Sequence, residues 1–148
     1  MALVETVTST VHLLVGALWV GAVVFFALAV LPRAAAGDLN AAPLGALVGS
    51  LTTWTRAAAV LMLLTGGHLA GTRYTVASLT GSTRGYLVLA MVVLWLGLAA
   101  LVEIGASRVR DGVERRKVRE PARNAVTPFR LAALVGLLLL VDAGVLLG

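Results

Sequence analysis

The chain has 148 residues, of which 59% are hydrophobic and 13% are charged. A typical soluble domain is about 45–50% apolar and about 25% charged, so this composition excludes an ordinary soluble domain and predicts an integral membrane protein. The chain has a net charge of +5 and contains no cysteine. Without cysteine, disulfides, iron–sulfur clusters and thiolate metal sites are excluded.

The first predicted element is a transmembrane helix over residues 3–31, with His12 inside it. Its apolar run exceeds the roughly 20 residues that cross a bilayer as a helix. Pro32 is expected to end it, because proline lacks a backbone N–H and clashes with the preceding turn. The alternative is a secretory signal peptide. The run is longer than a signal core and is preceded by Glu5 without Lys or Arg, so we expect a mature helix.

Three further transmembrane helices follow in the sequence. Residues 41–53 form either a short interfacial helix or the first turns of the second transmembrane helix, which covers residues 54–71. The third covers residues 84–106 and is expected to continue as a polar helix as far as Pro121. The fourth covers residues 128–147. These elements predict an all-α polytopic membrane protein, a four-transmembrane-helix bundle that forms a single transmembrane domain.

Basic residues are concentrated in the predicted loop at residues 107–127, between the third and fourth helices. Seven of the twelve Lys and Arg residues lie there, namely Arg108, Arg110, Arg115, Arg116, Lys117, Arg119 and Arg123. Short loops rich in Lys and Arg stay in the cytoplasm, and such clusters attract anionic lipids. We therefore expect a multi-pass protein of the cell membrane with both termini and loop 72–83 outside. Anionic lipids, rather than nucleic acid, are the expected partners of the basic loop.

This topology brings polar residues of distant helices to a similar depth. His12 lies early in the first helix, His68 late in the second and Asp142 late in the fourth, so all three fall in the outer half of the membrane. Ionisable groups there cost about 2.5–3.5 kcal/mol on insertion scales and usually face the bundle interior with a partner. We therefore predict a site with His12 and His68 as cofactor ligands, and with Asp142 and Met91 as further metal ligands.

Each of these residues also has a structural interpretation. His12 lies close enough to the outer headgroups to be an interfacial residue, and His68 can hydrogen-bond to Thr65 or to a neighbouring helix carbonyl. Asp142 fits the role of a partner for a histidine or an outer arginine better than that of a direct metal ligand. Met62 and Met91 carry soft sulfur donors that suit copper(I), but a methionine in an apolar helix usually fills the core.

Three segments of the chain match a known pattern. They read VHLLVGALWVGAVVFFALAVLP at residues 11–32, LTG at residues 64–66 and GSTRGYLVLAM at residues 81–91. Together they resemble the copper resistance D (CopD) membrane family. The first helix, which ends in LPR, is also similar to the HemJ type of protoporphyrinogen oxidase, a related four-helix protein. The resemblance covers most of the chain loosely and residues 11–33 specifically.

The resemblance implies a helical bundle linked to copper uptake, copper tolerance or haem chemistry, with His12 as the first-helix histidine. Both patterns usually carry a lysine in the third helix, where this chain has Met91. That departure argues against HemJ-type catalysis and leaves copper or haem binding as the broader implication.

Three functions stay open at this point. The first is a copper-handling membrane protein with a histidine site near the outer face, since imidazole and thioether ligands suit copper. The second is a haem b protein with His12 and His68 as axial ligands. The third is a cofactor-free accessory subunit that forms a homodimer or joins a larger membrane complex. The sequence contains no hydrolase triad, phosphate loop or dinucleotide fingerprint, so we predict no catalytic residues.

Overall fold

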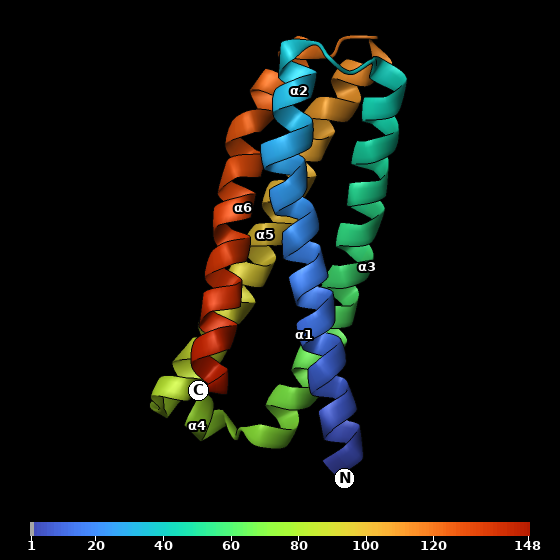
Figure 1. The fold of residues 1–148 in the computed structure, drawn as a ribbon. Coiled ribbons are helices and arrows are strands. Elements are labelled where there is room, and N and C mark those ends of the chain that lie inside the picture. The colour runs from blue at the N-terminus through green and yellow to red at the C-terminus, as the bar shows by residue number, and fades with distance from the viewer. Residues whose placement is uncertain (1) are drawn as a thin grey trace.

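The computed structural model describes residues 2–148, and over this range it confirms the predicted all-α fold. The described chain is helical without a strand. Four helical rods are long and apolar enough to cross a membrane, and they run alternately up and down as a bundle (Figure 1). The rods are Ala2–Ala36, Ala41–Arg73, Thr83–Glu114 and Arg119–Leu147.

The first rod continues past Pro32, which was expected to end it. It consists of α1 (Ala2–Phe25), a π-helical turn η1 (Phe26–Val30) and α2 (Leu31–Ala36). In η1 the N–H of Leu31 bonds to the carbonyl of Phe26, one residue further back than in an α-helix. The wider turn lies directly before Pro32 and shifts the hydrogen-bond register where an α-turn would lose a bond and clash with the ring.

The rod ends at Gly37 instead. Gly37 has a φ of 91°, in the left-handed region that favours glycine. The N–H of Asp38 bonds to the carbonyl of Arg33, and the N–H of Gly37 bonds to that of Ala34. This pair of bonds is a Schellman motif, which satisfies the last carbonyls of a helix.

The second rod is one continuous helix, α3 (Ala41–Arg73). Residues 41–53 are therefore its first turns rather than a separate interfacial helix. After α3 the chain forms a short helix, α4 (Val76–Gly81), inside the segment predicted as loop 72–83. It begins with a capping box, in which the side chains of Thr75 and Ser78 each accept a bond from the other residue's backbone N–H.

The predicted basic loop at residues 107–127 is mostly helical. The third rod, α5 (Thr83–Glu114), continues beyond residue 106 as the sequence indicated, but it ends at Glu114, short of the predicted Pro121. The fourth, α6 (Arg119–Leu147), begins before residue 128 and contains Pro121. Only residues 115–118 separate the two helices. Arg108 and Arg110 are thus on the end of α5 and Arg119 and Arg123 on the start of α6, while Arg115, Arg116 and Lys117 lie in the short turn between them.

Pro128 lies inside α6 rather than at its start. Because proline has no N–H, the carbonyl of Asn124 lacks its usual partner four residues later. Arg108 of α5 supplies the missing donor, since its Nη1 lies 2.7 Å from that carbonyl oxygen. A side chain from the neighbouring helix therefore compensates for the proline.

The core contains aromatic side chains packed against small residues. A Cβ on Gly105 would lie 2.8 Å from the ring of Phe129, so glycine lets α5 approach α6 closely, as small residues do in membranes. The Phe129 ring packs on Phe26 with centroids 4.8 Å apart. Trp19 is fully buried, and its Nε1 donates to Thr55 Oγ1 at 3.1 Å.

The outward faces of all four rods carry large apolar side chains. Soluble monomers rarely expose contiguous apolar patches larger than a few hundred Å², whereas a lipid-facing surface requires them. The exposed apolar residues include Leu14, Leu18, Phe25, Leu28, Val60, Leu63, Leu64, Val93, Leu96, Leu134 and Val141. Together with the four apolar rods, they indicate a multi-pass membrane protein.

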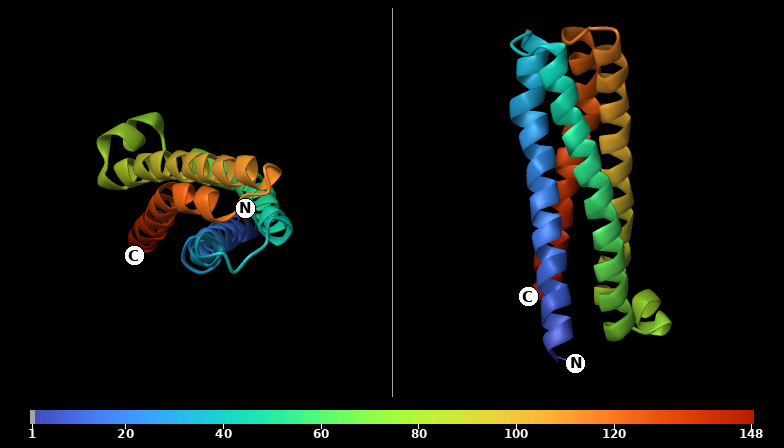
Figure 2. Two further views of the ribbon diagram at one scale, coloured as in Figure 1. Left: turned by 90° about the horizontal axis from the view of Figure 1, so that it is seen from above. Right: turned by 90° about the vertical axis from the view of Figure 1, so that its right-hand side faces the viewer.

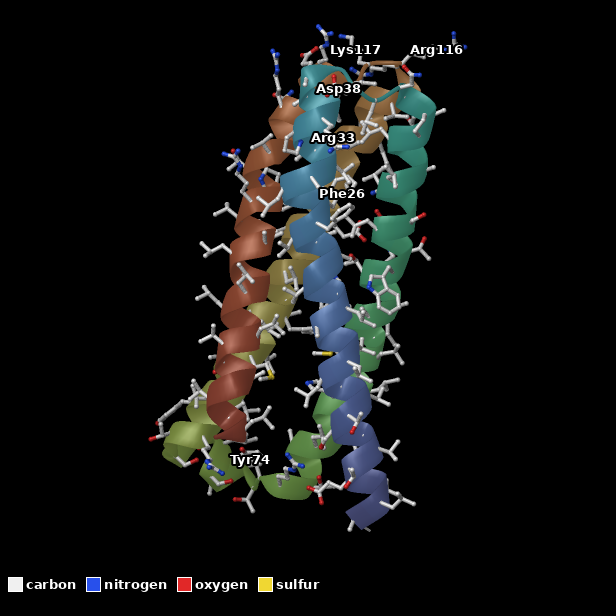
Figure 3. All side chains as sticks on the ribbon, viewed as in Figure 1. Phe26, Arg33, Asp38, Tyr74, Arg116 and Lys117 are labelled. Carbon is white, nitrogen blue, oxygen red and sulfur yellow. The ribbon has the colours of Figure 1, made fainter. Side chains whose placement is uncertain are left out.

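The two ends of the bundle differ in character. The N-terminus, the C-terminus and α4 lie at one end, which we call the terminal end (Figure 2). The connection between α5 and α6 lies at the opposite end, which we call the basic end. Arg33, Arg116 and Lys117 are at the basic end, and Tyr74 is at the terminal end (Figure 3).

Candidate functional site

Two adjoining hollows lie among the helices toward the terminal end. The first has a volume of about 130 Å³ and opens beside Arg73 and Tyr74. The second has a volume of about 150 Å³ and lies beside Met62 and Trp95. The residues that line both are His12, Gly66, Ala70, Val88 and Met91. We call the two hollows together the His12 cavity.

His12 is held in the cavity wall by a hydrogen bond. Its Nδ1 lies 2.7 Å from Thr65 Oγ1. The Thr65 hydroxyl donates its own proton to the carbonyl of Leu61, 2.6 Å away, so it accepts from His12. His12 therefore carries its proton on Nδ1, and Nε2 keeps a free lone pair. Metal-binding histidines have this arrangement, in which the second ring nitrogen donates to a fixed acceptor.

Two glycines allow α1 and α3 to approach each other at this level. A Cβ on Gly66 would lie 2.9 Å from Cε1 of His12, and a Cβ on Gly16 would lie 3.2 Å from Cε of Met62. Gly16 follows His12 by four residues, and Gly66 follows Met62 by four, so each pair shares one helix face. The His12 ring and the Met62 thioether are therefore neighbours along the α1–α3 contact.

Helix α5 supplies another wall of the His12 cavity. Met91 lines both hollows, and Trp95, one turn later on α5, lines the second. Met62 is almost fully buried, with 5% of its surface exposed. The cavity thus gathers one imidazole, two thioethers and one indole from three different helices.

Charged and polar side chains lie at the mouth of the first hollow. Arg73 donates from Nε to Glu5 at 2.7 Å and from Nη2 to Ser9 at 3.1 Å. Ser9 and Arg73 are also lining residues. The arginine charge beside the cavity is therefore balanced by a carboxylate of α1.

The structure does not place His68 with His12. His68 is exposed and lines neither hollow. An α-helix turns about 100° per residue, so His68, two residues after Gly66, points roughly 200° away from the face that contacts His12. The two histidines share a depth but not a direction.

Asp142 is buried at a similar depth on α6. Val135 contacts the Gly97 position across the α5–α6 interface. Because α5 and α6 run in opposite directions, seven residues after Val135 on α6 correspond to seven residues before Gly97 on α5. Asp142 therefore lies about level with Ala90 and its neighbour Met91. Its Oδ2 has no hydrogen-bond partner among residues 2–148. Asp142 lines neither hollow, whereas its neighbour Ala143 lines the first.

Within residues 2–148, no group of three or more His, Asp or Glu side chains is placed to hold a metal ion. Comparison with protein families, with curated proteins and with solved structures finds no match for this chain.

The sequence points to His12, to Met91 and to the sulfur of Met62, but not to Thr65 as the partner of His12 or to Trp95 in the cavity wall. The signal for Thr65 is present, because it lies one turn from Met62 on α3. Only the α1–α3 contact, however, shows which face of α3 meets His12. For Trp95 the signal was the spacing of one turn after Met91.

Proposed function

We propose that this chain is a copper-binding membrane protein of CopD-like type, which takes part in copper uptake or tolerance. The observation that carries the proposal is the His12 cavity, in which an oriented histidine with a free Nε2 meets two methionine side chains. Imidazole and thioether are ligands that suit copper. Copper here is the cargo rather than a resident cofactor.

The size of the cavity supports an ion over a large organic cofactor. Pockets for drug-sized ligands measure about 300–1,000 Å³, whereas the two hollows measure about 130 and 150 Å³. Haem b with His12 and His68 as axial ligands is the alternative, and it would require both histidines to face one space. A cofactor-free accessory subunit is the third possibility.

Metal analysis and an absorption spectrum of the purified protein in detergent test the proposal. We expect bound copper, which the His12→Ala variant loses. His68→Ala is the matched control, because it removes the other imidazole at the same depth on an exposed face, and it should keep the copper. A red protein whose Soret band is lost in His12→Ala would contradict the copper proposal and favour haem binding. Equal metal content in the wild type and in a His12→Ala/His68→Ala double variant would favour the accessory subunit.

We also propose that the basic end faces the cytoplasm and binds anionic lipid headgroups. A hollow of about 410 Å³ at that end is lined by three basic side chains, Arg108, Arg115 and Lys117, and by two acidic ones, Asp111 and Glu120. Phosphate groups of lipids are attracted to such clusters on the cytoplasmic leaflet. The terminal end, with the mouth of the His12 cavity, then faces outward, where copper enters.

Native mass spectrometry from nanodiscs tests the lipid proposal. We expect phosphatidylglycerol to remain bound where phosphatidylcholine does not. The preference should weaken in an Arg115→Gln/Lys117→Gln variant. An unchanged preference in that variant would contradict a headgroup site at the basic end.

A further inference from the structure

The lining of the His12 cavity indicates which oxidation state of copper it accepts. We propose that the site binds copper(I), with Nε2 of His12 and the sulfur atoms of Met62 and Met91 as ligands and with the indole face of Trp95 against the ion. This inference rests on the proposed function and adds Met62 and Trp95 to it.

The donor set is soft and uncharged. Thioethers select copper(I) among the first-row metals, and both methionines of the described chain line the second hollow together with His12. No carboxylate lines that hollow. A divalent ion would bring two charges to an apolar site without an anion, whereas copper(I) brings one.

Trp95 supplies attraction where a carboxylate is absent. A cation within about 6 Å of a tryptophan face is attracted by the negative face of the ring, more strongly when desolvated. The Nε1 of Trp95 is buried and has no hydrogen-bond partner among residues 2–148. Trp19, by contrast, is held by its bond to Thr55. The position of Trp95 is therefore set by packing against the core, at the wall of the second hollow.

The position of Met62 suits a ligand on the inner side of the ion. Its thioether packs where Gly16 leaves room, with Sδ 3.5 Å from the position a Cβ would take. His12 lies one turn nearer the terminal end than Gly16, on the same face of α1. An ion that enters beside Arg73 would thus meet His12 first and Met62 further in.

Tryptophan fluorescence tests the inference, with silver(I) as an air-stable probe for copper(I) and with anaerobic copper(I) titrations alongside. We expect silver(I) to quench the fluorescence of the wild type. The quenching should be lost in Trp95→Phe and kept in Trp54→Phe, because Trp54 lines a separate hollow near Ser50. Silver(I) affinity, measured by competition with a chelator, should fall about 2- to 30-fold in Trp95→Leu, as expected for a lost cation–π contact, and less in Trp95→Phe, whose ring keeps a weaker one.

The methionines are tested by Met62→Leu and Met91→Leu, which conserve volume and should keep the fold. Each should weaken silver(I) and copper(I) binding more than copper(II) binding. Wild-type silver(I) affinity in Met62→Leu or in Trp95→Leu, or unchanged quenching in Trp95→Phe, would overturn the inference while copper binding itself stands. Tighter binding of copper(II) than of copper(I) would overturn it as well. A wild type that binds neither ion would overturn the proposed function too.

Discussion

The Thr65 hydroxyl determines which nitrogen of His12 is free for a ligand. Thr65→Val removes the acceptor for His12 Nδ1–H and keeps the side-chain shape, so the imidazole loses its fixed tautomer and orientation. Loss of such an outer partner typically costs about 10- to 100-fold in metal affinity, and we expect a fall of that size for copper. Thr65→Ser retains the hydroxyl and should bind nearly as the wild type does. Equal affinities of the valine and serine variants would contradict this role.

Gly66 and Gly71 offer a matched test of the contact between α3 and His12. A methyl group at residue 66 would lie 2.9 Å from the His12 ring, whereas one at residue 71, which lines neither hollow, meets nothing within 4 Å. Gly66→Ala should displace the imidazole and weaken copper binding. Gly71→Ala should leave binding unchanged and gain up to about 1 kcal/mol of helix propensity. Competition titrations and thermal unfolding measure the two effects. Normal binding by Gly66→Ala would show that the ring tolerates displacement.

The candidate site could be predicted from the sequence only in part, because the sequence does not show how each helix is rotated about its axis. Hydropathy fixes the depth of a residue in a membrane helix but not the direction of its side chain around the axis. Depth alone grouped His12 with His68, while the close contacts at Gly16 and Gly66 turn Thr65 and Met62 toward His12 instead.

At the scale of the helix, the bond between Arg108 and the Asn124 carbonyl explains how α6 passes through Pro128. Replacing Pro128 by alanine would restore the backbone N–H and make the arginine redundant. We therefore expect Arg108→Met to lower the unfolding temperature of the wild type by a few degrees, at about 2–4 °C per kcal/mol for a chain of this size. In a Pro128→Ala background, Arg108→Met should lower the unfolding temperature by less. Thermal unfolding of the four proteins forms a double-mutant cycle, and strict additivity would contradict the compensation.

Helix existence was predictable, whereas helix ends were not. Apolar runs gave all four transmembrane helices, because about 20 apolar residues suffice to identify a span. Both boundaries that were predicted from prolines are wrong, namely the end of the first helix at Pro32 and the start of the fourth at Pro128. Pro32 is accommodated by the π-helical turn before it, and Pro128 by a side chain from another helix. The second compensation is tertiary and leaves no local mark in the sequence.

At the scale of the whole molecule, the four rods place both termini at one end and most of the positive charge at the other. Membrane insertion keeps short Lys- and Arg-rich connections in the cytoplasm. The terminal end carries Arg73 and Arg84, but Arg73 is paired with Glu5. The charge difference between the ends supports the proposed orientation, with a cytoplasmic basic end and an outward cavity mouth.

The absence of cysteine makes this orientation directly testable by single-cysteine labelling in intact cells. Thr80→Cys lies on exposed α4 at the terminal end, and Arg116→Cys lies in the exposed turn at the basic end. A membrane-impermeant maleimide should label Thr80→Cys in intact cells and label Arg116→Cys only after the cells are lysed. The reverse pattern would place the cavity mouth in the cytoplasm, and copper would then reach His12 from inside. Labelling of both before lysis would contradict a single orientation, because an impermeant reagent reaches only one face of a uniformly inserted bundle.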